Sequence, residues 1–98
     1  MNLRHVVIRG RVQGVGYRAF VQDQALRLAL EGWVRNRRNG AVEAVFAGPE
    51  EAVATALAAC HRGPPGARVD AVETEEGGDA LLRQRRAGER FSVLATAS

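Results

Sequence analysis

The sequence contains very few of the side chains from which metal and redox sites are built. Cys60 is the only cysteine, which excludes an intramolecular disulfide and any Cys-x-x-Cys metal knuckle. His5 and His61 are the only histidines, too few for a dedicated zinc or haem site. We therefore expect no metal and no cofactor, and a Ser-His-Asp or Cys-His hydrolase would have few candidate residues.

Lysine is absent, since all fourteen basic residues are arginine. Without lysine the chain has neither a Schiff-base nucleophile nor the cation of a Walker-type phosphate loop. Residues 1–50 hold eight arginines against four acidic residues, whereas residues 51–98 hold six against seven. Any surface that attracts anions is therefore expected in the first half, and a pI of about 10.4 leaves binding of nucleic acid open.

Long apolar runs are also missing, and none approaches the roughly 20 residues that span a bilayer. The first five residues lack the apolar stretch of a signal peptide, so we expect a cytoplasmic protein with no membrane partner. With 46% hydrophobic and 26% charged residues, the composition is that of a globular protein. We expect one domain over residues 1–98, and a monomer.

Hydrophobic patterning predicts two helices. Apolar residues at helical spacing indicate the first, from about Arg18 to a stop at Gly32. Pro49 followed by two acidic residues is typical of the start of the second, because acids are favoured at the positive end of the helix dipole. Glycines and prolines at residues 63–66 end that helix.

Five segments have the composition or alternation of strands: residues 3–9, 33–38, 41–47, 68–73 and 91–95. Asn39-Gly40 is typical of a two-residue type I′ hairpin turn, in which both central residues need positive φ. The polar residues 74–90 are expected to form a mobile connection or an irregular hairpin. The order βαββαβ plus a C-terminal strand predicts an α+β fold. It is a ferredoxin-like split βαβ sandwich with two helices on one face of an antiparallel sheet.

A glycine-rich segment connects the first strand to the first helix, with the sequence Gly10-Arg-Val-Gln-Gly-Val-Gly-Tyr-Arg18. Glycines let successive N–H groups turn towards one point, and the helix start adds free N–H groups and a positive dipole end. Arg18 supplies a planar guanidinium that can hold two phosphate oxygens. Singly, each feature is more typical of a tight turn, and the spacing is not that of dinucleotide-binding or Walker loops. Together they predict a phosphate cradle.

These residues resemble the acylphosphatase family. The glycine-rich segment is followed by Gly32-Trp-Val-Arg-Asn36 and then Asn39-Gly40-Ala-Val-Glu43, as in that family, and the resemblance covers about residues 6–72. Two departures are visible. Ala29 stands where the family often has glycine, and residues 74–90 are longer and more basic than expected.

The resemblance implies a cofactor-free enzyme that hydrolyses acyl phosphates to carboxylate and inorganic phosphate by direct in-line attack of water. It implies catalytic roles for Arg18 and for Asn36, which would position the water. The phosphate-binding residues would be Gln13, Gly14, Val15, Gly16, Tyr17 and Arg18, where inorganic phosphate or sulfate would compete. A carboxylate is a good leaving group, so this reaction needs charge stabilisation and an oriented water more than acid or base catalysis.

Several nearby polar residues have structural interpretations. Three arginines are expected to form a solvated edge that attracts anions without specific contacts: Arg35, Arg37 and Arg38. Tyr17 is expected to serve in packing more than in catalysis, and His5 to be an ordinary strand residue. Cys60 is expected to be buried as a small apolar group.

Two other functions remain open. One is a non-catalytic or weakly active phosphate-binding domain, like the acylphosphatase-like domain of hydrogenase-maturation carbamoyltransferases. The other is an RNA-binding module, which would stack bases on exposed aromatics of the central strands. Those strands, residues 3–9 and 41–47, contain only Phe46 as an aromatic, so we expect no nucleic-acid partner. The physiological acyl phosphate is not defined, because the cradle recognises the phosphate and little of the acyl group.

Overall fold

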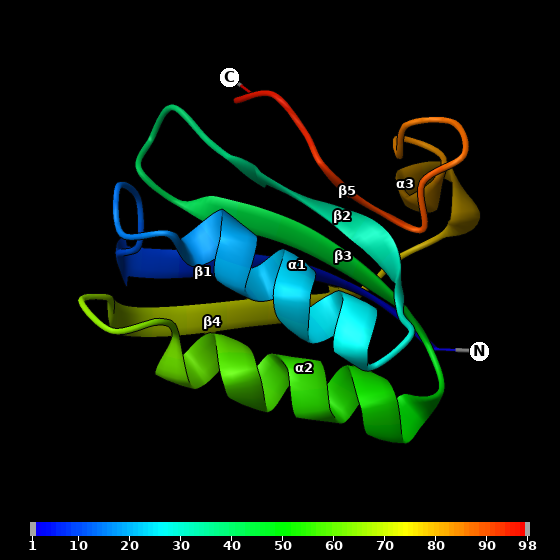
Figure 1. Ribbon diagram of the computed structural model, residues 1–98, viewed down its shortest axis with the longest axis horizontal. Coiled ribbons are helices and arrows are strands. Elements are labelled where there is room, and N and C mark those ends of the chain that lie inside the picture. Colours follow the sequence, from blue (N-terminus) through cyan, green and yellow to red (C-terminus); the bar gives the residue numbers. More distant parts are fainter. Residues whose placement is uncertain (1, 98) are drawn as a thin grey trace.

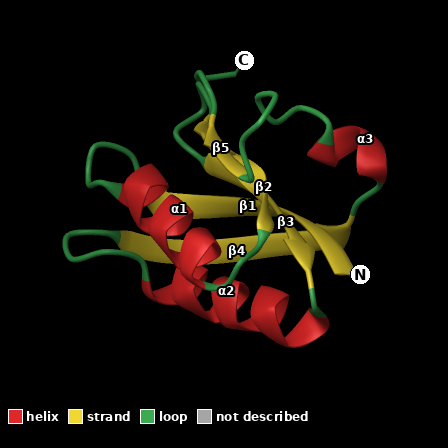
Figure 2. Cartoon of the chain, turned by 45° about the vertical axis from the view of Figure 1, so that its right-hand side comes forward, coloured by secondary structure: helices red, strands yellow, loops and turns green. Residues whose placement is uncertain are grey.

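The chain folds into a sheet covered on one face by two helices (Figure 1). A computed structural model describes residues 2–97. Its elements are β1 (Asn2–Arg11), α1 (Tyr17–Arg27), β2 (Glu31–Asn36), β3 (Val42–Gly48), α2 (Glu50–Arg62), β4 (Arg68–Glu76), α3 (Asp79–Leu82) and β5 (Phe91–Val93). In both overall views α1 and α2 lie side by side on the same face (Figures 1 and 2). This is the predicted ferredoxin-like α+β sandwich.

The strand order in the sheet is β4-β1-β3-β2-β5. The pairs β1–β4, β1–β3 and β2–β3 are antiparallel. The last strand joins the edge parallel to β2, with Phe91 beside Gly32, so the five-stranded sheet is mixed and not wholly antiparallel as predicted. A parallel neighbour needs a long crossover, and the segment from β4 through α3 supplies it. Within residues 2–97 no helix is long and apolar enough to cross a membrane.

The hydrophobic core lies between the sheet and the two long helices. Alternate strand residues point into it, and the helices contribute one buried face each; the fully buried members include Val6, Ile8, Val34, Ala44, Phe46, Val21, Ala25, Val53, Ala56 and Cys60. Tyr17, the first residue of α1, is buried there too, and its hydroxyl donates a 2.6 Å hydrogen bond to the Cys60 carbonyl oxygen. This contact anchors the end of the glycine-rich loop to α2. The packing expected for Tyr17 and the burial expected for Cys60 are both confirmed.

The first helix ends earlier than the sequence suggested. The Leu30 N–H donates to the Ala25 carbonyl oxygen at 2.9 Å, and the Ala29 N–H donates to that of Leu26 at 3.1 Å, the pattern of a Schellman motif. Ala29 closes it with φ of 56°. Gly32, predicted as the stop, lies inside β2, where a Cβ would collide with the Val45 carbonyl oxygen. That prediction was wrong because Gly32 serves the close approach of two strands.

The β2–β3 hairpin forms where Asn39-Gly40 predicted one, but with a different turn. The Arg37 N–H donates to the Ala41 carbonyl oxygen at 2.8 Å, and the Gly40 N–H to the Arg37 carbonyl oxygen at 3.2 Å. Gly40 has φ of 93°, whereas Asn39 does not have positive φ. The loop therefore has three residues closed by one left-handed glycine, and not the two-residue type I′ turn.

Residues 74–90 are neither a mobile connection nor an irregular hairpin. The first three extend β4 to Glu76, and residues 79–82 form α3. The Trp33 indole N–H donates to the Leu81 carbonyl oxygen at 2.6 Å, which fixes α3 over the sheet face opposite α1 and α2. Trp33 is thereby fully buried on the face that the two long helices leave open. The sequence did not reveal this because the partner atom is a backbone carbonyl.

Candidate active site

A cavity of about 310 Å³ lies where the glycine-rich loop meets α1 and the end of β2. Its lining residues are Val12, Gly14, Gly16, Tyr17, Arg18, Ala19, Gln22, Asn36 and Val93. The structure thus brings together both predicted catalytic residues and four of the six predicted phosphate-binding residues. The other two, Gln13 and Val15, are not part of the lining.

The start of α1 presents free backbone donors to this cavity. Gly16 is the N-cap residue, with φ of 79°, and no side chain caps the helix. No acidic residue occupies the first turn. The first N–H groups of a helix have no partner within it, and here no side chain replaces one. The helix start is therefore a site for an anion, reinforced by the helix dipole.

Arg18 is in the first turn of α1 and is half-buried. Among residues 2–97 no carboxylate forms an ion pair with it, although nine pairs of this kind involve His5 or seven other arginines. A cation at the positive end of a helix is unfavourable unless an anion joins it. The local charge thus favours a ligand with at least one negative charge, held by both the guanidinium and the helix start.

Asn36 ends β2 and faces the same cavity. Its side-chain oxygen is buried and has no hydrogen-bond partner among the residues that the structure describes. A buried acceptor without a donor destabilises a fold by roughly 1–3 kcal/mol. This is the only such side-chain atom found between residues 2 and 97. Asn36 and Arg18 line the same cavity, so a hydrogen-bond donor bound there would satisfy this oxygen.

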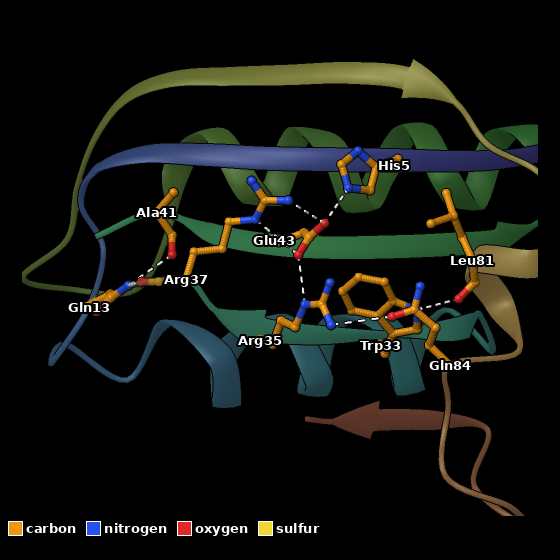
Figure 3. Close-up of polar contacts among 9 residues, drawn as sticks. All are labelled: His5, Gln13, Trp33, Arg35, Arg37, Ala41, Glu43, Leu81 and Gln84. Atoms are coloured by element: carbon orange, nitrogen blue, oxygen red, sulfur yellow. Dashed lines mark hydrogen bonds and ion pairs between the residues drawn. The ribbon is translucent and has the colours of Figure 1, made fainter. Parts of the chain in front are cut away.

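Gln13 ties the loop to the hairpin that follows Asn36. Its side-chain amide donates to the carbonyl oxygens of Arg37 at 2.7 Å and Ala41 at 2.9 Å (Figure 3). Because the Gln13 side chain binds the hairpin, the group of Gln13 that could face an anion is its backbone N–H. The side chain of Val15 packs against the hydrophobic core. The loop and the strand end that carries Asn36 are held together by these contacts.

The arginines on either side of Asn36 do not form the expected solvated edge. Arg35 donates to Glu43 at 2.7 Å, and Arg37 donates to both oxygens of the same carboxylate at 3.1 Å each. His5 Nε2 lies 2.6 Å from Glu43 Oε2, so His5 is also more than an ordinary strand residue. Only Arg38 is exposed as predicted.

Glu43 is the residue that sequence reasoning missed. Its side chain is 3% exposed, and burial alone would raise its pKa, but hydrogen bonds from Arg37, His5 and Arg35 lower the pKa to about 2. The hairpin register places Arg35 directly opposite Glu43, and the Asn39-Gly40 pair did not reveal that register. Cross-strand neighbours on one face interact, so a correct register would have paired them.

Comparison with known proteins gives one consistent result. Residues 4–87 match the family model for acylphosphatase. The chain is 61% identical over 94 residues to an acylphosphatase of Rhodopseudomonas palustris (strain BisB18), covering 96% of this chain and 95% of the relative. It is 62% identical over 91 residues to one of Bradyrhizobium diazoefficiens, covering 93% and 92%.

The fold gives the same answer as the sequence relatives. It superimposes on the crystal structure of acylphosphatase from Bacillus subtilis with a TM-score of 0.83 and 37% identity, covering 96% of this chain and 99% of that one. These matches span at least 92% of each relative and favour an enzyme over a phosphate-binding domain without activity. The chain belongs to the acylphosphatase family, whose members hydrolyse acyl phosphates.

Proposed function

We propose that acyl phosphates are hydrolysed in the cavity between the glycine-rich loop and Asn36, with Arg18 and Asn36 as the catalytic residues. The observation that carries this assignment is the buried, unpaired Asn36 oxygen in the same cavity as the Arg18 guanidinium and the uncapped start of α1. A cation and free amides suit a phosphate, and a lone acceptor beside them suits a water molecule.

The phosphate is held by two kinds of donor. Backbone N–H groups of residues 13–18 converge on it, and the Arg18 guanidinium binds two of its oxygens as a planar fork. All of these groups are present before the substrate binds, so little reorganisation accompanies the reaction. Inorganic phosphate and sulfate have the same shape and charge as this part of the substrate. We therefore expect both to compete with it.

Asn36 directs the attack. A water that donates a hydrogen bond to the Asn36 side-chain oxygen has its own lone pair free to approach phosphorus opposite the leaving carboxylate. The new bond joins the water oxygen to phosphorus, and the bond between phosphorus and the acyl oxygen breaks. The carboxylate leaves with that electron pair, and a phosphate oxygen takes the proton of the water. Arg18 and the amides stabilise the charge on the equatorial oxygens.

Two substitutions separate the roles. Arg18→Ala should lower kcat about 10²–10³-fold and weaken inhibition by inorganic phosphate, because it removes a preorganised charged donor. Arg18→Lys should recover little, since an ammonium cannot replace the fork. Asn36→Ala should lower kcat by about 10²-fold and leave inhibition by phosphate nearly unchanged, because the water acts only in the transition state.

The control is Arg27→Ala, which removes an exposed arginine from the other end of the same helix, where it pairs with Asp23. Its kinetics should match those of the unmodified protein. Equal losses of rate and phosphate affinity in Asn36→Ala would show that Asn36 is a phosphate ligand or a structural residue. Since residues of one chain complete the cavity, we also propose that the enzyme acts as a monomer, which light scattering at assay concentration can test.

A further inference from the structure

A buried ion cluster lies on the sheet face opposite the cavity, directly behind Asn36. At its centre the Glu43 carboxylate accepts hydrogen bonds from Arg35 and Arg37 and contacts His5 (Figure 3). The arginine side chains are 21% and 32% exposed, against 3% for Glu43. The three partners come from β1, from β2 and from the turn after β2, so the cluster joins segments distant in the sequence.

The cluster holds both chain neighbours of Asn36. Successive strand residues point to opposite faces, so Arg35 and Arg37 lie on one face while Asn36 faces the cavity on the other. Arg35 also stacks on Trp33, with its guanidinium carbon 4.5 Å from the ring centroid. One carboxylate thus fixes the residue before Asn36 and the residue after it.

Backbone hydrogen bonds also restrain this position. The Arg37 N–H donates to the Ala41 carbonyl oxygen at 2.8 Å, and the Ala97 N–H donates to that of Asn36 at 3.0 Å. β2 ends at Asn36, so the two bonds from the Arg37 side chain to Glu43 lie just beyond the strand end. They add a side-chain restraint on the reverse face of the sheet to the restraint that the backbone supplies.

We propose that Glu43 is a positioning residue for catalysis, which holds Asn36 in its water-directing orientation by binding Arg35 and Arg37 from the reverse face of the sheet. This inference rests on the proposed role of Asn36. Glu43 does not contact the substrate, so it should affect the step in which water attacks and not the binding of phosphate. A misplacement of about 1 Å in a reacting group can lower a rate by up to about 10²-fold.

The test is Glu43→Gln, which preserves the size of the side chain and removes the charge that attracts both arginines. We expect kcat to fall about tenfold, while the inhibition constant of inorganic phosphate changes less than about twofold. The matched control is Glu73→Gln, which removes a carboxylate that pairs with Arg9 at 3.2 Å across β4 and β1, far from Asn36. It should leave both quantities unchanged.

A double-mutant cycle distinguishes positioning from general damage. Once Asn36 is alanine, there is no side chain left to position, so Glu43→Gln should lower kcat no further in the Asn36→Ala background. An equal tenfold loss in both backgrounds would overturn the proposal, and so would unchanged kcat in the single variant. If Asn36→Ala itself had normal kcat, the proposed catalytic role of Asn36 would fail instead. The experiment therefore distinguishes failure of that role from failure of the positioning role of Glu43.

Arg37→Gln provides a second route if Glu43→Gln does not fold. Arg37 is partly exposed, and the variant leaves Glu43 with its contacts to Arg35 and His5. It should show the same signature at about threefold: lower kcat, unchanged phosphate inhibition, and no effect in the Asn36→Ala background. Circular dichroism confirms that each variant is folded, and an Arg37→Gln variant with normal kcat would overturn the proposal.

Discussion

Ala29→Gly should make this protein more stable. Ala29 is the only residue other than glycine with positive φ between residues 2 and 97, and it closes the Schellman motif at the end of α1. An L-residue in the left-handed region is disfavoured by roughly 1–2 kcal/mol, because its Cβ crowds the following carbonyl oxygen. Glycine relieves that strain and keeps both hydrogen bonds of the motif.

The gain is reduced by the flexibility of glycine in the unfolded chain, which opposes folding by roughly 0.5–1 kcal/mol. The net expectation is a stabilisation of about 0.5–1 kcal/mol. For a chain of this length that corresponds to a rise of about 2–4 °C in the midpoint of thermal unfolding. Ala29 does not line the cavity, so kcat and KM should not change.

The assay is urea unfolding followed by circular dichroism, with Ala54→Gly as the control. Ala54 is exposed within α2, where glycine should destabilise by about 1 kcal/mol. Both substitutions add the same flexibility to the unfolded chain. The difference in stability between the two variants, about 1.5–2 kcal/mol, therefore isolates the strain at Ala29. If the two variants lose the same stability, the strain does not exist and the reasoning is refuted.

Three further predictions follow from burial and charge. Cys60 is 1% exposed and burial raises its pKa to about 12, so a thiol reagent at pH 8 should react with it only after unfolding. The pKa of Glu43 is lowered to about 2 from an ordinary 4.5, which contributes about 3 kcal/mol to the free energy of unfolding above pH 4.5. This contribution is lost as pH falls from 4.5 towards 2. The difference in stability between the unmodified protein and Glu43→Gln should therefore shrink in that window. Guanidinium and amide groups do not titrate near neutrality, so kcat should be nearly flat between about pH 5.5 and 8, with or without EDTA. If kcat instead changed sharply near neutral pH, and this change disappeared in His5→Gln or His61→Gln, the result would contradict the roles of Arg18 and Asn36.

The order of the five strands and two long helices, and the glycine-rich loop before α1, could be predicted because they depend on neighbours in the chain. β-branched runs, helical spacing in α1 and α2, and the glycines before Arg18 act over a few residues, and the structure places the elements accordingly. Arg18 and Asn36 were identified through a motif resemblance. Their meeting in one cavity is a property of the folded sheet, since 17 residues and a helix separate them.

Hairpin register could not be predicted from the Asn39-Gly40 signal. A two-residue loop would place Glu43 opposite Asn36, on the cavity side of the sheet. The three-residue loop shifts the pairing by one residue and places Glu43 opposite Arg35 on the reverse face. A slip of one residue moves every side chain to the other face. The expectation of solvated arginines failed for this reason.

The sequence by itself determined which segments become the five strands and the two long helices. It also determined where the glycine-rich loop meets the start of α1. Both follow from local spacing and conformational preference. Tertiary structure alone decided the register of β2 against β3, the placement of α3 over Trp33, and the carboxylate shared by Arg35 and Arg37. Each of these depends on a few hydrogen bonds between segments distant in the chain. These hydrogen bonds stabilise the protein only after the sheet has brought those segments together.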